Sequence, residues 1–222
     1  MKTFVITIFT LLAISNAGAT EPENTSVLES PATPRSSFNY FASANYAFVD
    51  IPILSKYGGT VGLISNPDQT WELEYMKGSV GSSILLSDIA NVSDTKISLI
   101  GRTYFGGSFH LSYGISYFDF SMTLGDEFMN SVNGNYPSAD VLKIQGWGIA
   151  AGFGNTWTIR KNINIGIDWM CLAQPLLITT KDADYLKDSS DPDDRDKVQT
   201  AVDILSYLPR LSLIQVHVGM MF

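Results

Sequence analysis

His110 and Ser112 are the residues of this chain whose types and spacing come nearest to a catalytic pair. Residues two apart on a strand share a face, and a neutral imidazole activates a serine by accepting its hydroxyl proton. Their apolar neighbours Leu111 and Tyr113 belong to the opposite face. We therefore expect His110 and Ser112 on a polar interior face, and we interpret His110 and His217 as hydrogen-bonded interior residues without a catalytic role.

Residues 188–196, DSSDPDDRD, carry enough carboxylates to hold calcium. They lack the glycine and the spaced oxygen ligands of a known calcium loop, so we interpret the run as a solvated acidic loop. The single cysteine, Cys171, cannot form an internal disulfide and is expected as an unreactive residue on the apolar face of a strand. We predict no metal site, no cofactor and no catalytic residue.

The charge balance is acidic, with 22 Asp and Glu against 14 Lys and Arg and a formal net charge of −8. An acidic surface repels polyanions, so nucleic acid is not an expected partner. The length of 222 residues is sufficient for one domain with a sizeable core.

The N-terminus has the pattern of a secretory signal. Met1 and Lys2 precede the apolar run FVITIFTLLAIS, and Ala17-Gly18-Ala19 offers the small residues at which a signal peptidase cuts. A membrane-spanning anchor would need roughly twenty apolar residues. We therefore expect residues 1–19 to be a signal peptide and the mature chain to be exported.

Most of the remaining chain alternates apolar and polar residues with a period of two. The stretch NINIGIDWMCLAQ, residues 162–174, is an example. Its apolar positions are Ile163, Ile165, Ile167, Trp169, Cys171 and Ala173, and its other positions include Asn162, Asn164, Gly166, Asp168 and Gln174. Such alternation predicts β-strands with one apolar and one polar face.

Eight segments show this alternation. They are residues 37–49, 58–66, 70–80, 94–105, 108–121, 141–157, 162–174 and 210–222. An even number of antiparallel strands can close into a barrel, which leaves no unpaired edge. We predict an all-β fold, an eight-stranded antiparallel up-and-down transmembrane barrel with a short helix in its last long loop.

A soluble sandwich or a lipocalin-like barrel shows the same alternation with its apolar face inward. Three features favour a membrane barrel. The segments have nine or more residues, enough for a tilted strand to cross a bilayer. Acidic and basic residues share the polar faces, which suits an enclosed interior. Aromatic residues collect toward strand ends, as in interfacial girdles: Tyr40, Trp71, Tyr104, Phe105, Phe120, Trp157 and Trp169.

The connections alternate between short turns and long loops. Short turns are expected at 66–69, 106–108 and 159–162, and longer polar loops at 81–93, 122–140 and 175–209, with a shorter first loop at 50–57. This asymmetry is typical of a barrel with periplasmic turns and extracellular loops. Residues 20–36 are then a periplasmic N-terminal linker, and 37–222 form the barrel.

The inward faces are predicted to hold a network of paired charges. Its members are Glu72, Glu74, Lys96, Arg102 and Asp168. Eight strands enclose a space just wide enough for side chains, and an unpaired charge there is costly. We expect these charges to pair across the interior and to leave no large pore.

The last long loop, 175–209, contains a helical pattern at about 192–208. Asp191 can cap a helix that starts with Pro192 and stops before Pro209. Its apolar positions, at helical spacing, are Val198, Ala201, Val202, Leu205 and Leu208. We expect this stripe to pack over the barrel mouth, with docking of an extracellular partner or the outer leaflet as the alternative.

The chain ends on IQVHVGMMF, in which alternate residues are apolar and the last is aromatic. This strand resembles the C-terminal signal that the barrel-assembly machinery recognises in Gram-negative outer-membrane proteins. The residues that carry the resemblance are Ile214, Val216, Val218, Met220 and Phe222, with the polar Gln215 between them. One departure is His217 where that pattern commonly has Gly.

The mature chain as a whole resembles small outer-membrane barrels of the OmpA-transmembrane or OmpX type. The resemblance implies location in the cell outer membrane, contact with outer-membrane lipid and lipopolysaccharide, and assembly by the barrel machinery.

Three functions remain open at this point. We favour a non-enzymatic barrel with a structural or surface-interaction role through its extracellular loops. The alternatives are a lipid-modifying enzyme and a narrow small-solute channel. The His110-x-Ser112 pair resembles that of lipid A deacylases, although the Asn expected after the Ser is absent.

Overall fold

The computed structural model describes residues 35–80, 90–124, 139–159, 162–183 and 192–222. The expected signal peptide 1–19, the linker up to residue 34 and the capping residue Asp191 lie outside these ranges.

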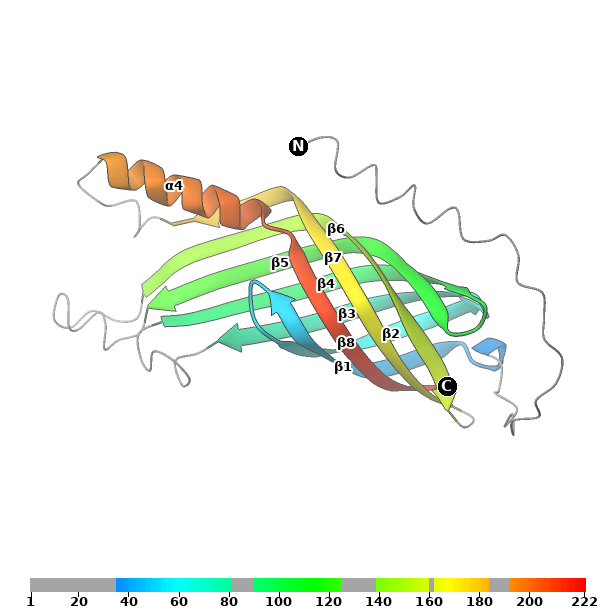
Figure 1. The fold of residues 1–222 in the computed structure, drawn as a ribbon. Coiled ribbons are helices and arrows are strands. Elements are labelled where there is room, and N and C mark those ends of the chain that lie inside the picture. The colour runs from blue at the N-terminus through cyan, green and yellow to red at the C-terminus, as the bar shows by residue number, and fades with distance from the viewer. Residues whose placement is uncertain (1–34, 81–89, 125–138, 160–161, 184–191) are drawn as a thin grey trace. The chain divides into compact units, whose positions relative to one another are not determined.

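Eight antiparallel strands close into a barrel in the order of the sequence, each pairing with its neighbours and β8 with β1 (Figure 1). The strands are β1 Tyr40–Ile51, β2 Lys56–Asn66, β3 Gln69–Val80, β4 Ala90–Phe105, β5 Phe109–Leu124, β6 Ala139–Ile159, β7 Ile163–Asp182 and β8 Arg210–Met221. The predicted all-β eight-stranded barrel is confirmed.

Two helical elements accompany the barrel. A short 3-10 helix, η1 at Arg35–Ser37, precedes β1. The helix α4, Pro192–Tyr207, lies between β7 and β8, as the period of the last loop predicted. Among the residues that the structure describes, no helix combines the length and the apolar character needed to cross a membrane.

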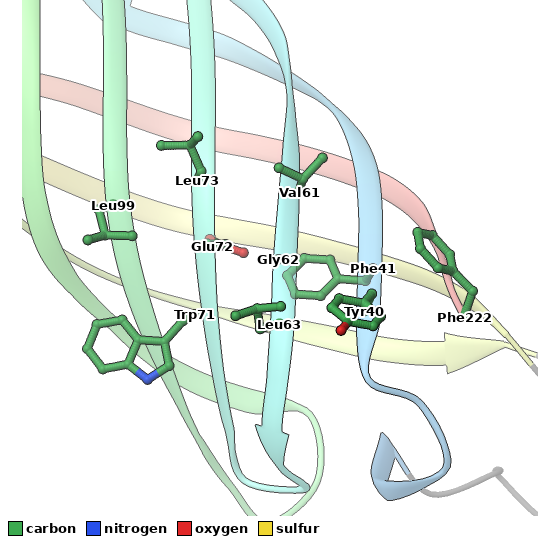
Figure 2. Close-up of a pocket in the computed structure, with 10 residues that line it drawn as sticks. All are labelled: Tyr40, Phe41, Val61, Gly62, Leu63, Trp71, Glu72, Leu73, Leu99 and Phe222. Atoms are coloured by element: carbon green, nitrogen blue, oxygen red, sulfur yellow. The ribbon is translucent and has the colours of Figure 1, made fainter.

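The barrel is polar inside and apolar outside. Along β3, Glu72 and Glu74 are buried whereas Trp71, Leu73 and Tyr75 are exposed. Figure 2 shows this alternation, with Trp71 and Leu73 on the near side of the sheet and Glu72 behind it. Because every backbone group of a closed sheet bonds to a neighbouring strand, the outer surface needs no polar partner.

Four consecutive strands are longer than a bilayer crossing requires. Strands β4 and β5 have 16 residues each, β6 has 21 and β7 has 20, against 11 or 12 in the others. The predicted loop 175–209 is therefore wrong in its first part, because residues 175–182 continue β7. This part of β7 extends past the ends of the short strands β1 and β8, and it pairs with the neighbouring strand β6.

The residues of β7 that point inward change from even-numbered to odd-numbered positions in the middle of the strand. Trp169 and Met170 both point outward, because the pairing of β6 with β7 shifts by one residue there, as in a β-bulge. Cys171 and Ala173, expected on the apolar outer face, are consequently buried inside the barrel. The outward positions of this half-strand are Met170 and Leu172 instead.

The inward and outward positions also switch at the same level in the neighbouring strands β8 and β1. Leu213 pairs with Met170 on one side and with Val49 on the other. In β1, Phe48 and Val49 are both exposed, and in β8 Ile214 has a φ of 55°. A β-branched residue rarely adopts this conformation, so the strained backbone at Ile214 marks the point where β8 reverses its faces.

Two of the expected girdle aromatics lie inside the barrel. Tyr104 and Phe120 are buried, because both occupy inward positions of their strands. Trp71, Phe105 and Trp157 are exposed on the outer wall, as are the further members Tyr40 and Trp169.

Candidate functional site

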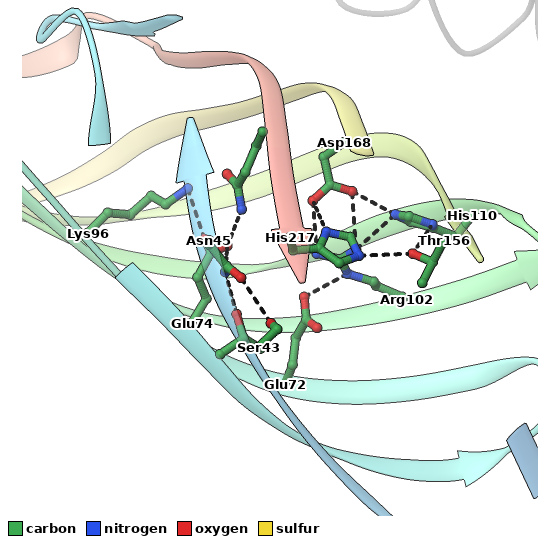
Figure 3. Close-up of polar contacts among 12 residues, drawn as sticks. Ser43, Asn45, Glu72, Glu74, Lys96, Arg102, His110, Thr156, Asp168 and His217 are labelled. Carbon is green, nitrogen blue, oxygen red and sulfur yellow. Dashed lines mark hydrogen bonds and ion pairs between the residues drawn. The ribbon is translucent and has the colours of Figure 1, made fainter. Parts of the chain in front are cut away.

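The barrel interior holds a network of charged and polar side chains, and Figure 3 shows Arg102 in contact with several of them. Arg102 lies three residues before the short-turn end of β4 at Phe105. Its Nε donates to Glu72 Oε1 at 2.7 Å. Its Nη1 and Nη2 donate to the two carboxylate oxygens of Asp168 at 3.1 and 2.9 Å. One guanidinium from β4 thus joins carboxylates from β3 and β7, and bidentate pairing with Asp168 fixes its orientation.

Both histidines contact Asp168 and Thr156. His110 Nε2 lies 2.7 Å from Asp168 Oδ1, and its Nδ1 lies 3.5 Å from Thr156 Oγ1. His217 Nε2 lies 3.1 Å from the same hydroxyl, and its Nδ1 lies 3.9 Å from Asp168 Oδ2. The group formed by Glu72, Arg102, His110, Thr156, Asp168 and His217 is called the Arg102 cluster below.

The order carboxylate, imidazole and hydroxyl in Asp168, His110 and Thr156 is that of a nucleophilic triad. The triad has no access to a substrate, however, because His110 is 0% and Thr156 3% exposed. Within the described residues no hydrogen bond joins His110 to Ser112, and the hydrogen-bonding atoms of the His110 ring face Asp168, Arg102 and Thr156. The arrangement fits a structural polar network better than an active site.

A second cluster surrounds Glu74 at a level farther from the short turns. Glu74 Oε1 lies 3.1 Å from Lys96 Nζ, and its Oε2 accepts from Gln215 at 2.6 Å and from Asn45 at 3.3 Å. Asn45 also donates to Thr60 at 2.6 Å. The carboxylate therefore has partners from three other strands.

A third cluster lies toward the long-loop end, around Lys56. Its Nζ is 2.6 Å from Asp50 Oδ1 and 2.6 Å from Asp94 Oδ2, and all three side chains are buried. Ser212 donates to the other oxygen of Asp50. Arg210 stands close by, with its guanidinium 5.4 Å from the centre of the Phe120 ring.

Glycines on the inward faces make room for these side chains. A Cβ added at Gly166 would lie 2.0 Å from His217 Nε2, and one at Gly154 would lie 2.6 Å from Asp168 Oδ1. The alternating glycines of β6, residues 146, 148, 152 and 154, likewise lie close to bulkier neighbours, because a Cβ at Gly148 would stand 2.9 Å from the Phe118 ring and one at Gly152 would stand 2.8 Å from Ser112 Oγ.

Arg35 closes the end of the barrel that carries the short turns. Its guanidinium donates to the carbonyl oxygens of Pro67, Gly107 and Thr156 at 3.4, 3.2 and 3.2 Å. It also lies 3.6 Å from the centre of the Tyr104 ring. Burial lowers the pKa of Arg35 below its usual value, whereas the nearby Tyr104 and Asp68 raise it.

Toward the opposite end, α4 contributes to a buried apolar cluster. Val202 of the helix packs with Phe120, Leu142, Ile144 and Ala183. Leu205 is partly buried against the same cluster. The helix therefore covers the inner face of the long strands, where β1 and β8 have already ended.

The outer wall also has shallow hollows beside its glycines. One of them, about 490 Å³, lies next to Gly62 and is lined mostly by apolar side chains, including Val61, Leu63 and Leu73 (Figure 2). Among the described residues no group of three or more His, Cys, Asp and Glu side chains is placed to hold a metal ion.

All five residues expected in the interior network are buried in the barrel, and the structure distributes them over two clusters. Glu72, Arg102 and Asp168 meet in one, and Glu74 meets Lys96 in the other.

The sequence reasoning missed the Lys56 cluster and the closure by Arg35. Lys56 falls in the expected loop 50–57, whereas in the structure it begins β2 and, two residues before Gly58, continues the inward positions of that strand. No signal of spacing identifies Arg35, because it precedes the first strand.

The fold defines a class, the closed eight-stranded antiparallel β-barrel with a charged interior. No protein-family model matches the sequence, and no curated protein matches it.

Several solved barrels are similar in structure. The N-terminal β-barrel domain of Pseudomonas aeruginosa OprF is 13% identical and has a TM-score of 0.43, and the match covers 83% of this chain and 98% of that one. Neisserial surface protein A is 12% identical with a TM-score of 0.44, and the match covers 84% of this chain and 98% of that one. Acinetobacter baumannii CarO is 15% identical with a TM-score of 0.47, and the match covers 84% of this chain and 99% of that one. At this level of similarity the roles of those proteins do not transfer to this chain.

Proposed function

We propose that this protein is a non-enzymatic barrel of the Gram-negative outer membrane, with a structural or surface-interaction role through the segments at its long-loop end. The observation that carries the proposal is the inverted distribution of its residues. Charged side chains such as Glu74 and Lys96 are buried inside, whereas large apolar side chains such as Leu73 and Ile115 are exposed. Exposing such a surface to water costs free energy, whereas contact with the acyl chains of a bilayer stabilises it.

The apolar outer belt has a height that suits a membrane. On β5 its outward residues run from Phe109 to Tyr117, eight residue steps, or roughly 26 Å along the strand. At a tilt near 40° that length gives about 20 Å of apolar height, close to the band of known barrels. Directly above it the outer face becomes polar, with Gln145 donating to Asp119 at 2.8 Å.

The partners follow from this location. Outer-membrane lipid and lipopolysaccharide would contact the belt, and the barrel-assembly machinery would act on the C-terminal strand with its exposed Val218, Met220 and Phe222. An extracellular partner would meet the segment 175–209, of which the end of β7 and α4 are described.

Two competing functions have less support. A channel needs a water path, but the interior is crossed by paired charges and the two ends carry Arg35 and the α4 cluster. A lipid-modifying enzyme needs a nucleophile that lipid can reach, but Ser112 and Thr156 are buried in the interior.

Location is tested by fractionating cells that express the full chain. The protein should appear with outer membranes, and its gel mobility should change on boiling, because closed barrels resist detergent at room temperature. Recovery in the soluble periplasmic fraction would contradict the proposal.

The closed interior is tested by planar-bilayer recording of the purified protein. We expect no steady conductance for the native chain. A large, steady conductance would revive the channel function. A matched variant, Arg35→Ala, removes the three contacts at the short-turn end and should raise the frequency of brief openings. An unchanged frequency would mean that Arg35 does not close this end.

A further inference from the structure

The exposed face of α4 changes from polar to apolar along the helix. Asp196 and Thr200 stand on it near the middle of the helix, and Ile204 and Tyr207 follow at intervals of four and three residues. Ile204 is 64% and Tyr207 53% exposed. Side chains three and four apart share one helix face, so the gradient runs along a single stripe.

Contacts with the barrel fix which face this stripe occupies. On the opposite side of the helix, Val202 packs with Phe120 and Ile144, and Ser206 is buried. Lys181 of β7 pairs with Asp203 on the flank. The apolar residues of the stripe therefore point away from the barrel interior and have no cover in the described structure.

The C-terminal end of α4 lies at the upper edge of the apolar belt. Gln174 of β7 donates to the backbone oxygen of Tyr207 at 3.2 Å, which holds the last turn beside the bend of β7 (Figure 1). The next outward residues of β7, Leu176 and Leu177, are 59% and 60% exposed. Leu177 pairs with Trp147, whose ring lies 5.2 Å from that of Tyr117, the last outward aromatic of the β5 belt.

We infer that the last turn of α4, with Ile204 and Tyr207, docks into the outer leaflet together with Leu176 and Leu177 of β7. This inference rests on the proposed membrane location. The docked surface is continuous with the belt through Leu177 and Trp147, and tyrosine at its end suits the boundary between acyl chains and head groups. Asp196 stands about 12 Å farther along the helix axis, in water.

This docking gives α4 a second anchor beyond its packing on the barrel. The helix is held at the membrane surface by its last turn, and its acidic first half projects outward. A partner that approaches from outside the cell would meet the first half, because the last turn is covered by lipid.

The test uses depth-dependent quenching. Single cysteines are placed at Asp196, Thr200, Ile204 and Tyr207 in a Cys171→Ala background, each labelled with an environment-sensitive fluorophore. The full-length variants are reconstituted in phosphatidylcholine vesicles with and without phospholipids brominated near the glycerol end. Ile115→Cys, in the middle of the belt on β5, is the control for membrane insertion.

We expect quenching at 204 and 207 to reach at least half of that at 115, with little at 200 and none at 196. Quenching at 115 without quenching at 204 or 207 would overturn the docking and leave the membrane location intact. A label at 204 that is shielded from water but not quenched would also overturn it, in favour of a protein contact. No quenching at any position, including 115, would overturn the proposed membrane location as well.

Discussion

Arg102 and Asp168 face each other inside the barrel, with two hydrogen bonds of 3.1 and 2.9 Å between the guanidinium and the carboxylate. They lie 66 residues apart, on β4 and β7, which are not neighbours in the sheet. The pair therefore crosses the interior and ties together opposite parts of the wall.

Replacing Arg102 should destabilise the barrel strongly. Arg102→Met leaves the buried Glu72 and Asp168 without their shared cation, and loss of one partner from a buried ion pair costs about 3–5 kcal/mol. Glu72→Gln keeps the Arg102–Asp168 pair and should cost only about 1–2 kcal/mol. The free energy of unfolding, measured by urea titration in lipid vesicles, compares the two. Equal losses for both variants would mean that Arg102 does not organise this cluster.

Lys56 should contribute more to the free energy of unfolding than an exposed lysine of the neighbouring strand. Lys56→Met removes the cation that both Asp50 and Asp94 contact at 2.6 Å, so two buried carboxylates lose their partner at once. We expect a loss of about 3–5 kcal/mol. Lys77→Met, at an exposed position of β3, should change stability by no more than about 0.5 kcal/mol. The same titration measures both, and a Lys56→Met barrel as stable as the Lys77→Met barrel would contradict the prediction.

Gly166 and His217 should be coupled. A Cβ at residue 166 would stand 2.0 Å from His217 Nε2, so Gly166→Ala forces the ring away from Thr156 and should cost about 1–3 kcal/mol. In a His217→Ala background the added methyl group meets no ring, and the same substitution should cost less. A double-mutant cycle on the free energy of unfolding gives the coupling. Additive effects would show that the clash is relieved elsewhere.

Variants of the last two residues should differ in their effects: one should mainly reduce assembly in cells, and the other should mainly reduce stability. Phe222 is exposed on the outer wall, and its ring stacks on Tyr40, whereas Met221 is buried inside. If the C-terminal strand is the proposed assembly signal, its outward residues are those that the machinery would contact, so deleting Phe222 should reduce the assembled fraction in cells far more than Met221→Ala. In detergent micelles without the machinery, Met221→Ala should be the less stable of the two, since it leaves a cavity. The opposite order in cells would remove Phe222 from the assembly signal.

The sequence alone predicted the number of strands and the faces of most of them. Each strand residue points either inward or outward, so local alternation of residue types, as in Trp71 to Tyr75, is sufficient to recognise both the strand and its polar side. The helix at 192–207 was likewise predictable, because its helical period begins and ends at prolines. These features depend on neighbours in the sequence and not on distant contacts.

Tertiary structure decided where that alternation breaks and which charges meet. The reversal at Trp169, with Cys171 turned inward, follows from a shift in pairing with β6 that no local pattern encodes. The same holds for the length of β7, because residues 175–182 pair with β6 beyond the point where the pairing with β8 ends. Arg102 pairs with Asp168, and Arg35 closes the short-turn end, because of how the strands are staggered around the closed barrel. That stagger is set by all eight strands together.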